Sequence, residues 1–337
     1  MPTFRLSSQI DWFVSSFEAI DRHSPPVRLA ADNSQSGTME LLFSKGAPID
    51  KDNNTLLHCT AGGGYTDTVK LLLDKDTPIE ARNTHSNTPL HLAAKNGHPC
   101  IIKLLLTKGA FIDARNTDGY TPLHLAAKNG HPGAIKLLLG RGASNPTNDA
   151  LLHLAAENGH TNTVELLLTQ GASIEARNMD GYTPLHLAAR KGHTGMVDLL
   201  LKEGSLIHAI NNYTNTSLHL AAWTGHTGIV DLLLRKGASI EAIGQYGDTP
   251  LHFAARGGHT GTVELLLKKG SVIGAMNKCT NTPLHLAAWK GHTGVVDLLL
   301  REGASIEAIG QYGDAPLHTA TRGVILEQWN FYLKKVL

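Results

Sequence analysis

The chain has 337 residues, 42% of them hydrophobic, and its 30 basic and 29 acidic side chains give a formal net charge of +1. This composition is typical of a soluble folded protein and lacks the excess of basic side chains that binds a nucleic-acid backbone, so we expect no nucleic-acid partner. The opening residues show no signal peptide, and no uncharged apolar segment is long enough to predict a membrane span. Three widely spaced cysteines favour a reducing compartment, the cytoplasm with the nucleus as an alternative.

The first predicted element is an amphipathic helix within residues 1–22. Its apolar stripe consists of Ile10, Phe13, Val14, Phe17 and Ile20. We expect this helix to cap the unit that follows, and a free partner-binding helix is the alternative.

Residues 23–52 resemble a degenerate copy of the unit that repeats through the rest of the chain. Pro25 and Pro26 precede an apolar run in which the Thr and His of the later copies are missing, whereas residues 40–47 keep the end of the unit. Terminal repeats of a stack are commonly atypical, so we assign this segment as the first repeat.

A Thr-Pro-Leu-His element, or a near variant, organises the remaining sequence. Its histidine falls at His58, His91, His124, His153, His186, His219, His252, His285 and His318. Every interval is 33 residues except one of 29, because residues 144–150 are four residues shorter than their counterparts. We expect the shortening to fall in the loop and predict eight repeats over residues 53–312, one of them with a shortened turn.

One unit shows why each repeat should form two helices. Thr121 is a suitable N-cap and Pro122 suits the first helical turn, where its missing N–H is not needed. Apolar residues then recur at helical spacing until Gly130, which tolerates a left-handed stop. A second apolar face follows with Ile135 and Leu138, so the unit is predicted to be a helix-turn-helix.

Between units the sequence is polar and contains Asp118-Gly119 and Asp180-Gly181, which favour tight turns. Helices this short need neighbouring units to bury their apolar faces.

The string TDGYTPLHLAAKNGHPGAIKLLLGRGA resembles the ankyrin repeat almost position for position, and the resemblance extends over residues 23–322. It implies an all-α solenoid of stacked helix-turn-helix units with β-turn fingers. In that family the short inner helices and the fingers line a concave groove that recognises proteins, and the histidine of Thr-Pro-Leu-His bonds the neighbouring Thr and backbone groups.

Residues 313–337 depart from the pattern after Gly323. Ile325, Trp329, Tyr332 and Leu333 replace the usual second helix. We predict a partial repeat with a C-terminal cap on a monomer, and a dimer formed through this segment is the alternative.

The 19 histidines do not predict a metal or catalytic site. Nine belong to Thr-Pro-Leu-His and seven follow the glycine that ends the first helix, so their regularity indicates a structural role. Helices pack about 8–10 Å apart, whereas zinc needs its ligands within about 2.1 Å, so equivalent histidines in successive units cannot share an ion. We expect no metal, no cofactor, no catalytic residue and no enzymatic activity.

Binding residues should be those that the repeat leaves variable and that the family places on the groove. On the first helices they are Lys95, Lys128, Arg190, Lys191, Trp223, Arg256, Trp289 and Lys290, and on the turns Tyr120, Tyr182, Tyr213 and Tyr246. Trp, Tyr and Arg dominate interface energetics, and the set is mainly basic, so we expect a protein partner with an acidic segment. The alternative for these aromatic rings is packing on neighbouring turns.

Residues 215–248 and 281–314 are nearly identical, a period of 66 residues that spans two repeats. Similar recognition chemistry should therefore recur in every second unit.

Two other functions stay open at this point. A pocket at the irregular junction 141–153 could serve a small-molecule-binding or enzymatic protein, because a shortened finger could open a cleft there. A structural solenoid with no selected partner is also compatible with near-identical repeats.

Overall fold

The computed structural model describes residues 37–38, 41, 56–144, 148–310 and 312–322. Within these residues every regular element is helical and no strand occurs, so the predicted all-α architecture is confirmed. The helix expected in residues 1–22, most of the repeat expected in residues 23–52 and the cap expected after Arg322 lie outside the described residues.

The chain divides into two units, residues 1–145 and 146–337. The helices of the first unit are α4 (Leu56–Gly63), α5 (Thr66–Leu73), α6 (Pro89–Lys95), α7 (Pro99–Thr107), α8 (Pro122–Lys128) and α9 (Pro132–Gly140). Those of the second are α10 (Asn148–Glu157), α11 (Thr161–Thr169), α12 (Pro184–Lys191), α13 (Thr194–Lys202), α14 (Ser217–Thr224), α15 (Thr227–Arg235), the 3₁₀ turn η1 (Gln245–Gly247), α16 (Pro250–Gly257), α17 (Thr260–Lys268), α18 (Pro283–Lys290), α19 (Thr293–Arg301) and α20 (Pro316–Arg322).

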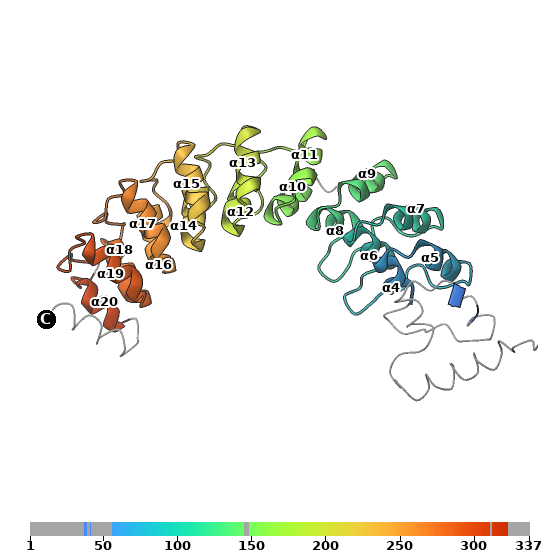
Figure 1. Ribbon diagram of the computed structural model, residues 1–337, viewed down its shortest axis with the longest axis horizontal. Helices are drawn as coiled ribbons and strands as arrows, with labels where there is room; N and C mark the ends of the chain where they lie inside the picture. The colour runs from blue at the N-terminus through green and yellow to red at the C-terminus, as the bar shows by residue number, and fades with distance from the viewer. Residues whose placement is uncertain (1–36, 39–40, 42–55, 145–147, 311, 323–337) are drawn as a thin grey trace, which may run out of the picture. The chain divides into compact units, whose positions relative to one another are not determined.

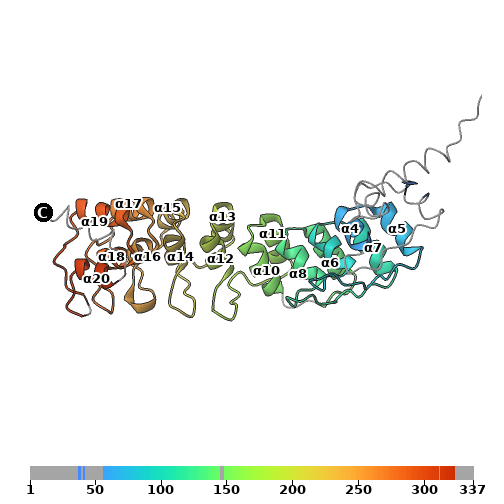
Figure 2. The same cartoon turned by 90° about the horizontal axis from the view of Figure 1, so that it is seen from below.

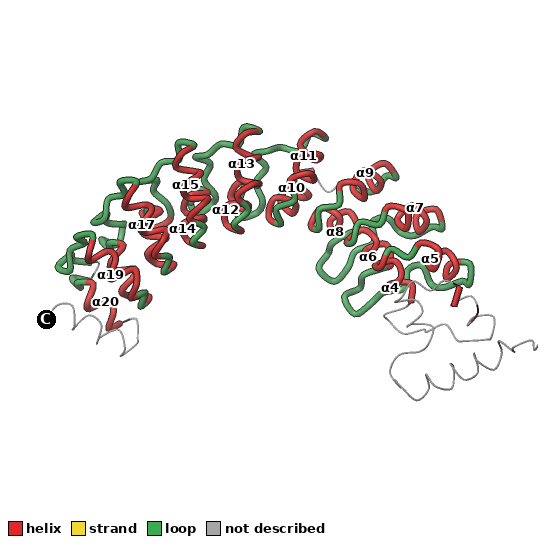
Figure 3. The backbone as a smooth tube through the Cα atoms, in the orientation of Figure 1, coloured by secondary structure: helices red, strands yellow, loops and turns green. Residues whose placement is uncertain are grey.

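Each unit is a stack of helical pairs. In the second unit the inner helices contact one another in succession, in the order α10, α12, α14, α16, α18 and α20. The outer helices form a second row behind them, in the order α11, α13, α15, α17 and α19 (Figure 1). Irregular loops join the pairs (Figure 3) and extend as fingers from one side of the helices (Figure 2). The first unit repeats the pattern, with α4, α6 and α8 inside and α5, α7 and α9 outside.

The apolar face of each helix is buried against its neighbours. Leu185 and Ala188 of α12, and Val197 and Leu200 of α13, have no exposed surface. Helices of seven to ten residues are unstable alone in water, so this burial between pairs holds the stack together. Among the described residues, no helix combines the length and the apolar character that crossing a membrane requires.

The Thr-Pro-Leu-His element fixes the start of an inner helix and links it to the next repeat. At α12, Thr183 is the extended N-cap and Pro184 occupies the first turn. The Thr183 N–H donates to Nδ1 of His186 at 3.2 Å, so the ring proton lies on Nε2, which donates to the Asn215 carbonyl at 3.0 Å. These are the Thr and backbone contacts that the resemblance implied.

The Gly-His pair forms a second link between repeats. Gly192 ends α12 with a φ of 88°, a conformation that favours glycine. The His226 ring of the next repeat covers Gly192 so closely that an added Cβ would lie 2.7 Å from it, and His226 Nε2 donates to the Arg190 carbonyl at 3.2 Å. The same bond is made by His98, His193, His259 and His292.

The shortened repeat differs from the others in its inner helix. α10 begins at Asn148, five residues before His153, whereas α12 begins at Pro184, two residues before His186. No Thr-Pro fixes the helix start here, and His153 Nδ1 contacts the Asp149 carbonyl at 2.6 Å instead of a threonine. In the shortened repeat the inner helix therefore starts earlier than in α12, an effect that the sequence did not predict.

Candidate functional site

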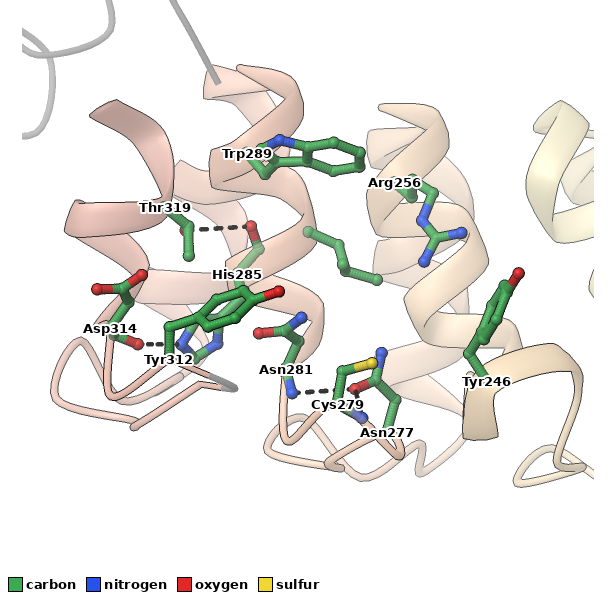
Figure 4. Close-up of a pocket in the computed structure, with 11 residues that line it drawn as sticks. Tyr246, Arg256, Asn277, Cys279, Asn281, His285, Trp289, Tyr312, Asp314 and Thr319 are labelled. Carbon is green, nitrogen blue, oxygen red and sulfur yellow. Dashed lines mark hydrogen bonds between the residues drawn. The ribbon is translucent and has the colours of Figure 1, made fainter. Parts of the chain in front are cut away.

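The inner helices and fingers of the second unit enclose a hollow of about 420 Å³. We call it the Trp289 hollow. In Figure 4 the Trp289 indole forms its upper wall, with Arg256 and Tyr246 on one side and His285 and Tyr312 on the other. Because α16, α18, α20 and the fingers before them all contribute, the hollow exists only through stacking.

A second hollow of about 380 Å³ adjoins the first, and we call it the Trp223 hollow. Trp223, Phe253 and Tyr213 line it, and it shares Tyr246 and Arg256 with the Trp289 hollow. The two hollows thus form one lined groove along the inner face of α12 to α20, the face where the resemblance places protein recognition.

Four of the predicted aromatic residues are well exposed on this groove. The exposed fraction is 40% for Trp223 and 44% for Trp289, and it is 42% for Tyr213 and 58% for Tyr246. These residues can still bury area against a partner, as an interface anchor requires.

The two other predicted tyrosines pack within their own repeats. Tyr182 is half-buried against the His186 ring, with centroids 6.0 Å apart, and Arg190 lies 5.3 Å from its centroid. Tyr120 of the first unit makes the same contacts with His124 and Lys128. Tyr182 also lines the Trp223 hollow and is part of the groove.

Several of the predicted basic residues already bind acidic groups. Glu157 pairs with Arg190 at 3.5 Å and with Lys191 at 3.3 Å. Arg256 pairs with Asp248, while Lys290 places its Nζ 4.2 Å from the centroid of the Trp289 ring. Lys95, on the first unit, is exposed at the end of α6. The groove is consequently less basic than the sequence alone indicates.

The Arg256–Asp248 pair is part of a buried network. The Asp248 side chain is 1% exposed, and its Oδ1 accepts a hydrogen bond from Asn277 Nδ2 at 2.6 Å. A buried carboxylate is costly unless it is paired and hydrogen-bonded, and here both oxygens are satisfied. The network joins an inner helix to two successive fingers and holds the wall that the two hollows share.

Tyr246 sits on a strained fingertip. Its φ is 60°, in the left-handed region that few non-glycine residues adopt, and Gly247 follows with a φ of 78°. The Tyr246 carbonyl accepts the Lys278 N–H of the next finger at 2.8 Å, which holds the turn in place. Such strain persists where the surroundings enforce it and is frequent at binding sites.

The sequence reasoning missed an apolar stripe along the fingers of the second unit. It comprises Ile210, Ile243, Met276 and Ile309, which occupy one register position and are exposed by 44%, 59%, 60% and 57%. Earlier repeats have arginine there: Arg82 donates to the Arg115 carbonyl at 2.7 Å, and Arg177 donates to the Ile210 carbonyl at 2.6 Å. The sequence does carry a signal for this stripe, because the arginine of earlier repeats is replaced by an apolar residue at the same repeat position.

The buried histidines are neutral structural groups. Burial lowers the pKa of His91, His186 and His219 to about 4, because the charged ring would lose its hydration. In the part of the chain that the structure describes, no three His, Cys, Asp or Glu side chains gather as metal ligands.

Two expectations fall on residues that the structure does not describe. The cleft proposed at the junction 141–153 includes residues 145–147, and the dimerisation alternative concerns residues after Arg322. Both stay hypotheses.

Comparison with known proteins assigns the family. A family model of ankyrin repeats, taken three copies at a time, matches residues 27–116, 78–149, 111–178, 152–244 and 241–310. No match to a curated protein was found. The matched ranges cover far more than half of the chain, so the protein belongs to the ankyrin-repeat family.

Proposed function

We propose that the protein is a non-enzymatic interaction scaffold that binds a protein partner in the groove formed by the Trp223 and Trp289 hollows. Ankyrin repeats are generally protein–protein interaction modules, which supports the general role. We place the binding site on the second unit because its inner helices and fingers line the two hollows.

One observation carries the proposal. Trp223 and Trp289 occupy the same repeat position two repeats apart, and each keeps 40% or more of its surface exposed on the wall of a hollow. The same repeat position carries lysine, glutamate or arginine in other repeats, so the fold does not require an indole there. Tryptophan is enriched among the residues that dominate binding energy at interfaces.

The ion pairs already present in the groove indicate which side chains the partner should use. Arg190, Lys191 and Arg256 already bind carboxylates, so an acidic segment of the partner would have to compete with these ion pairs. Lys290, which lies over the Trp289 ring, is the better placed cation of the groove. We propose apolar and aromatic anchors as the main source of affinity, with acidic residues of the partner near Lys290 adding a smaller part.

We further propose that the scaffold acts as a monomer in the cytoplasm. The compartment is proposed from the three scattered cysteines, and the monomer from the C-terminal cap expected in residues 313–337.

The test is affinity purification from the native cell, followed by quantitative mass spectrometry. The variant with Trp223→Ala and Trp289→Ala should lose the specific partner while its circular dichroism spectrum stays helical. Phe111→Ala is the matched control, because Phe111 is a large aromatic residue exposed by 68% in the first unit. Full recovery of the partner by the double variant would disprove the groove assignment.

A further inference from the structure

The two hollows are copies of one design. Eight lining positions of the Trp223 hollow recur 66 residues later in the Trp289 hollow, and six of these carry the same residue. Trp223 corresponds to Trp289, and Leu220 to Leu286. Because most of the lining is the same, the two positions that differ show what distinguishes the two hollows.

The decisive difference is Phe253, which corresponds to Thr319. The Phe253 ring is 8% exposed and lies edge-on to Trp223, with ring centroids 6.0 Å apart and planes at 78°. It also lies edge-on to His219 at 5.1 Å. The protein therefore fills this part of the Trp223 hollow with an aromatic ring of its own.

Among the residues that the structure describes, none places a corresponding ring in the Trp289 hollow. Thr319 directs its hydroxyl to the backbone, donating to the Pro316 carbonyl at 2.7 Å and to the His285 carbonyl at 3.4 Å (Figure 4). A second ring is also absent, because Cys279 replaces Tyr213. The Trp289 hollow therefore has room beside Trp289 at the place where the Phe253 ring fills the Trp223 hollow.

We propose that the Trp289 hollow takes an aromatic side chain of the partner, seated edge-on to Trp289 as Phe253 is seated on Trp223. This assignment rests on the proposed function and specifies its main anchor. The occupied hollow supplies the template: an edge-to-face aromatic pair in a site that matches at six of the eight shared lining positions.

The lining of the hollow carries charges of both signs. Lys290 Nζ lies 4.2 Å from the centroid of the Trp289 ring, and Arg256 on the opposite wall is paired with Asp248. Asp314 also lines the hollow. The aromatic wall and the template of the filled hollow, rather than the charges, therefore favour an aromatic ring.

Exchanging the residue types at Phe253 and Thr319, one at a time, tests the proposal in the full-length chain. The chain has four tryptophans, so 5-fluorotryptophan labelling gives resolved fluorine NMR signals that single Trp→Phe variants assign. N-acetylphenylalanine amide is the probe. We expect millimolar titration to shift the Trp289 signal, and Thr319→Phe to weaken that binding about tenfold by filling the site from within.

Two matched variants complete the design. Phe253→Thr should open the twin hollow and make the Trp223 signal respond to the probe. Thr319→Val removes the hydroxyl without adding a ring, so it should leave the titration at Trp289 unchanged. Equal probe binding by Thr319→Phe and the wild type, or no response of Trp223 in Phe253→Thr, would overturn the proposal.

The same variants separate this proposal from the proposed function. Thr319→Phe should recover much less partner in the pull-down than Thr319→Val does. If Thr319→Phe binds the partner normally while the double tryptophan variant does not, the groove stands and the aromatic anchor at Trp289 is wrong. If the double tryptophan variant also binds normally, the groove assignment itself fails.

Discussion

Arg256 binds the nearly inaccessible Asp248, with Nη2 and Oδ2 2.7 Å apart. Removing the guanidinium in Arg256→Ala leaves a buried carboxylate with only Asn277 as its partner. We expect a loss of about 3 kcal/mol in the free energy of unfolding, the low end for a broken buried pair, because Arg256 is 23% exposed. Urea unfolding followed by circular dichroism measures it.

Two comparisons show whether the buried charge causes that loss. Asn215 and Asn281 occupy the position of Asp248 in neighbouring repeats, so Asp248→Asn added to Arg256→Ala should restore much of the stability. Lys268→Ala breaks an exposed pair with Glu264 and should change stability far less. Equal losses for Arg256→Ala and Lys268→Ala would mean that the network contributes little.

The Gly-His link predicts an unequal response to glycine substitutions. Gly192→Ala forces an alanine into the left-handed region and its Cβ against the His226 ring. It should cost about 1–2 kcal/mol or more. Gly228→Ala lies in α15 with nothing near its Cβ, so it should be neutral or slightly stabilising. Thermal unfolding of the two variants compares them, and a stable Gly192→Ala would refute the close approach.

The buried histidines predict a loss of stability in mild acid. The pKa of His91, His186 and His219 falls from 6.5 to about 4 on folding, chiefly through burial. Between these pH values the unfolded chain binds more protons than the folded one. Stability should be complete above about pH 6.5 and decline as the pH falls towards 4. A urea midpoint that stays constant from about pH 7 to pH 5 contradicts this assignment.

The apolar finger stripe can be tested by restoring the arginine of earlier repeats. In Ile243→Arg the new guanidinium can reach the Met276 carbonyl, as Arg177 reaches that of Ile210. Stability should change by no more than about 0.5 kcal/mol, because Ile243 is 59% exposed. Partner affinity, measured by calorimetry, should fall if the partner covers the stripe. Unchanged affinity would place the stripe outside the interface.

The local rules of the sequence predicted the repeat well. Thr183 as N-cap, Pro184 in the first turn and the glycine stop follow from properties of single residues, and the structure shows all three. The period of 33 residues then placed each unit in the stack. Helix existence and order were predictable because each signal is contained within one repeat.

The detailed groove was less predictable because it depends on contacts between repeats. Phe253 meets Trp223 only after two inner helices stack, and Asp248 meets Arg256 only after the finger folds back. The positive φ of Tyr246 likewise has no signal in the sequence, because Tyr213, at the same repeat position, does not share it. The sequence identified Trp223 and Trp289 as exposed candidates but could not show that one hollow is filled and its twin is not.

Hydrogen–deuterium exchange of the chain with and without its captured partner tests the central claim most directly. If the groove binds the partner, amides of the fingers at residues 211–216, 244–249 and 277–282 should become protected, while those of the outer helices α15, α17 and α19 keep their exchange rates. Protection of the outer helices with unchanged fingers would contradict the account.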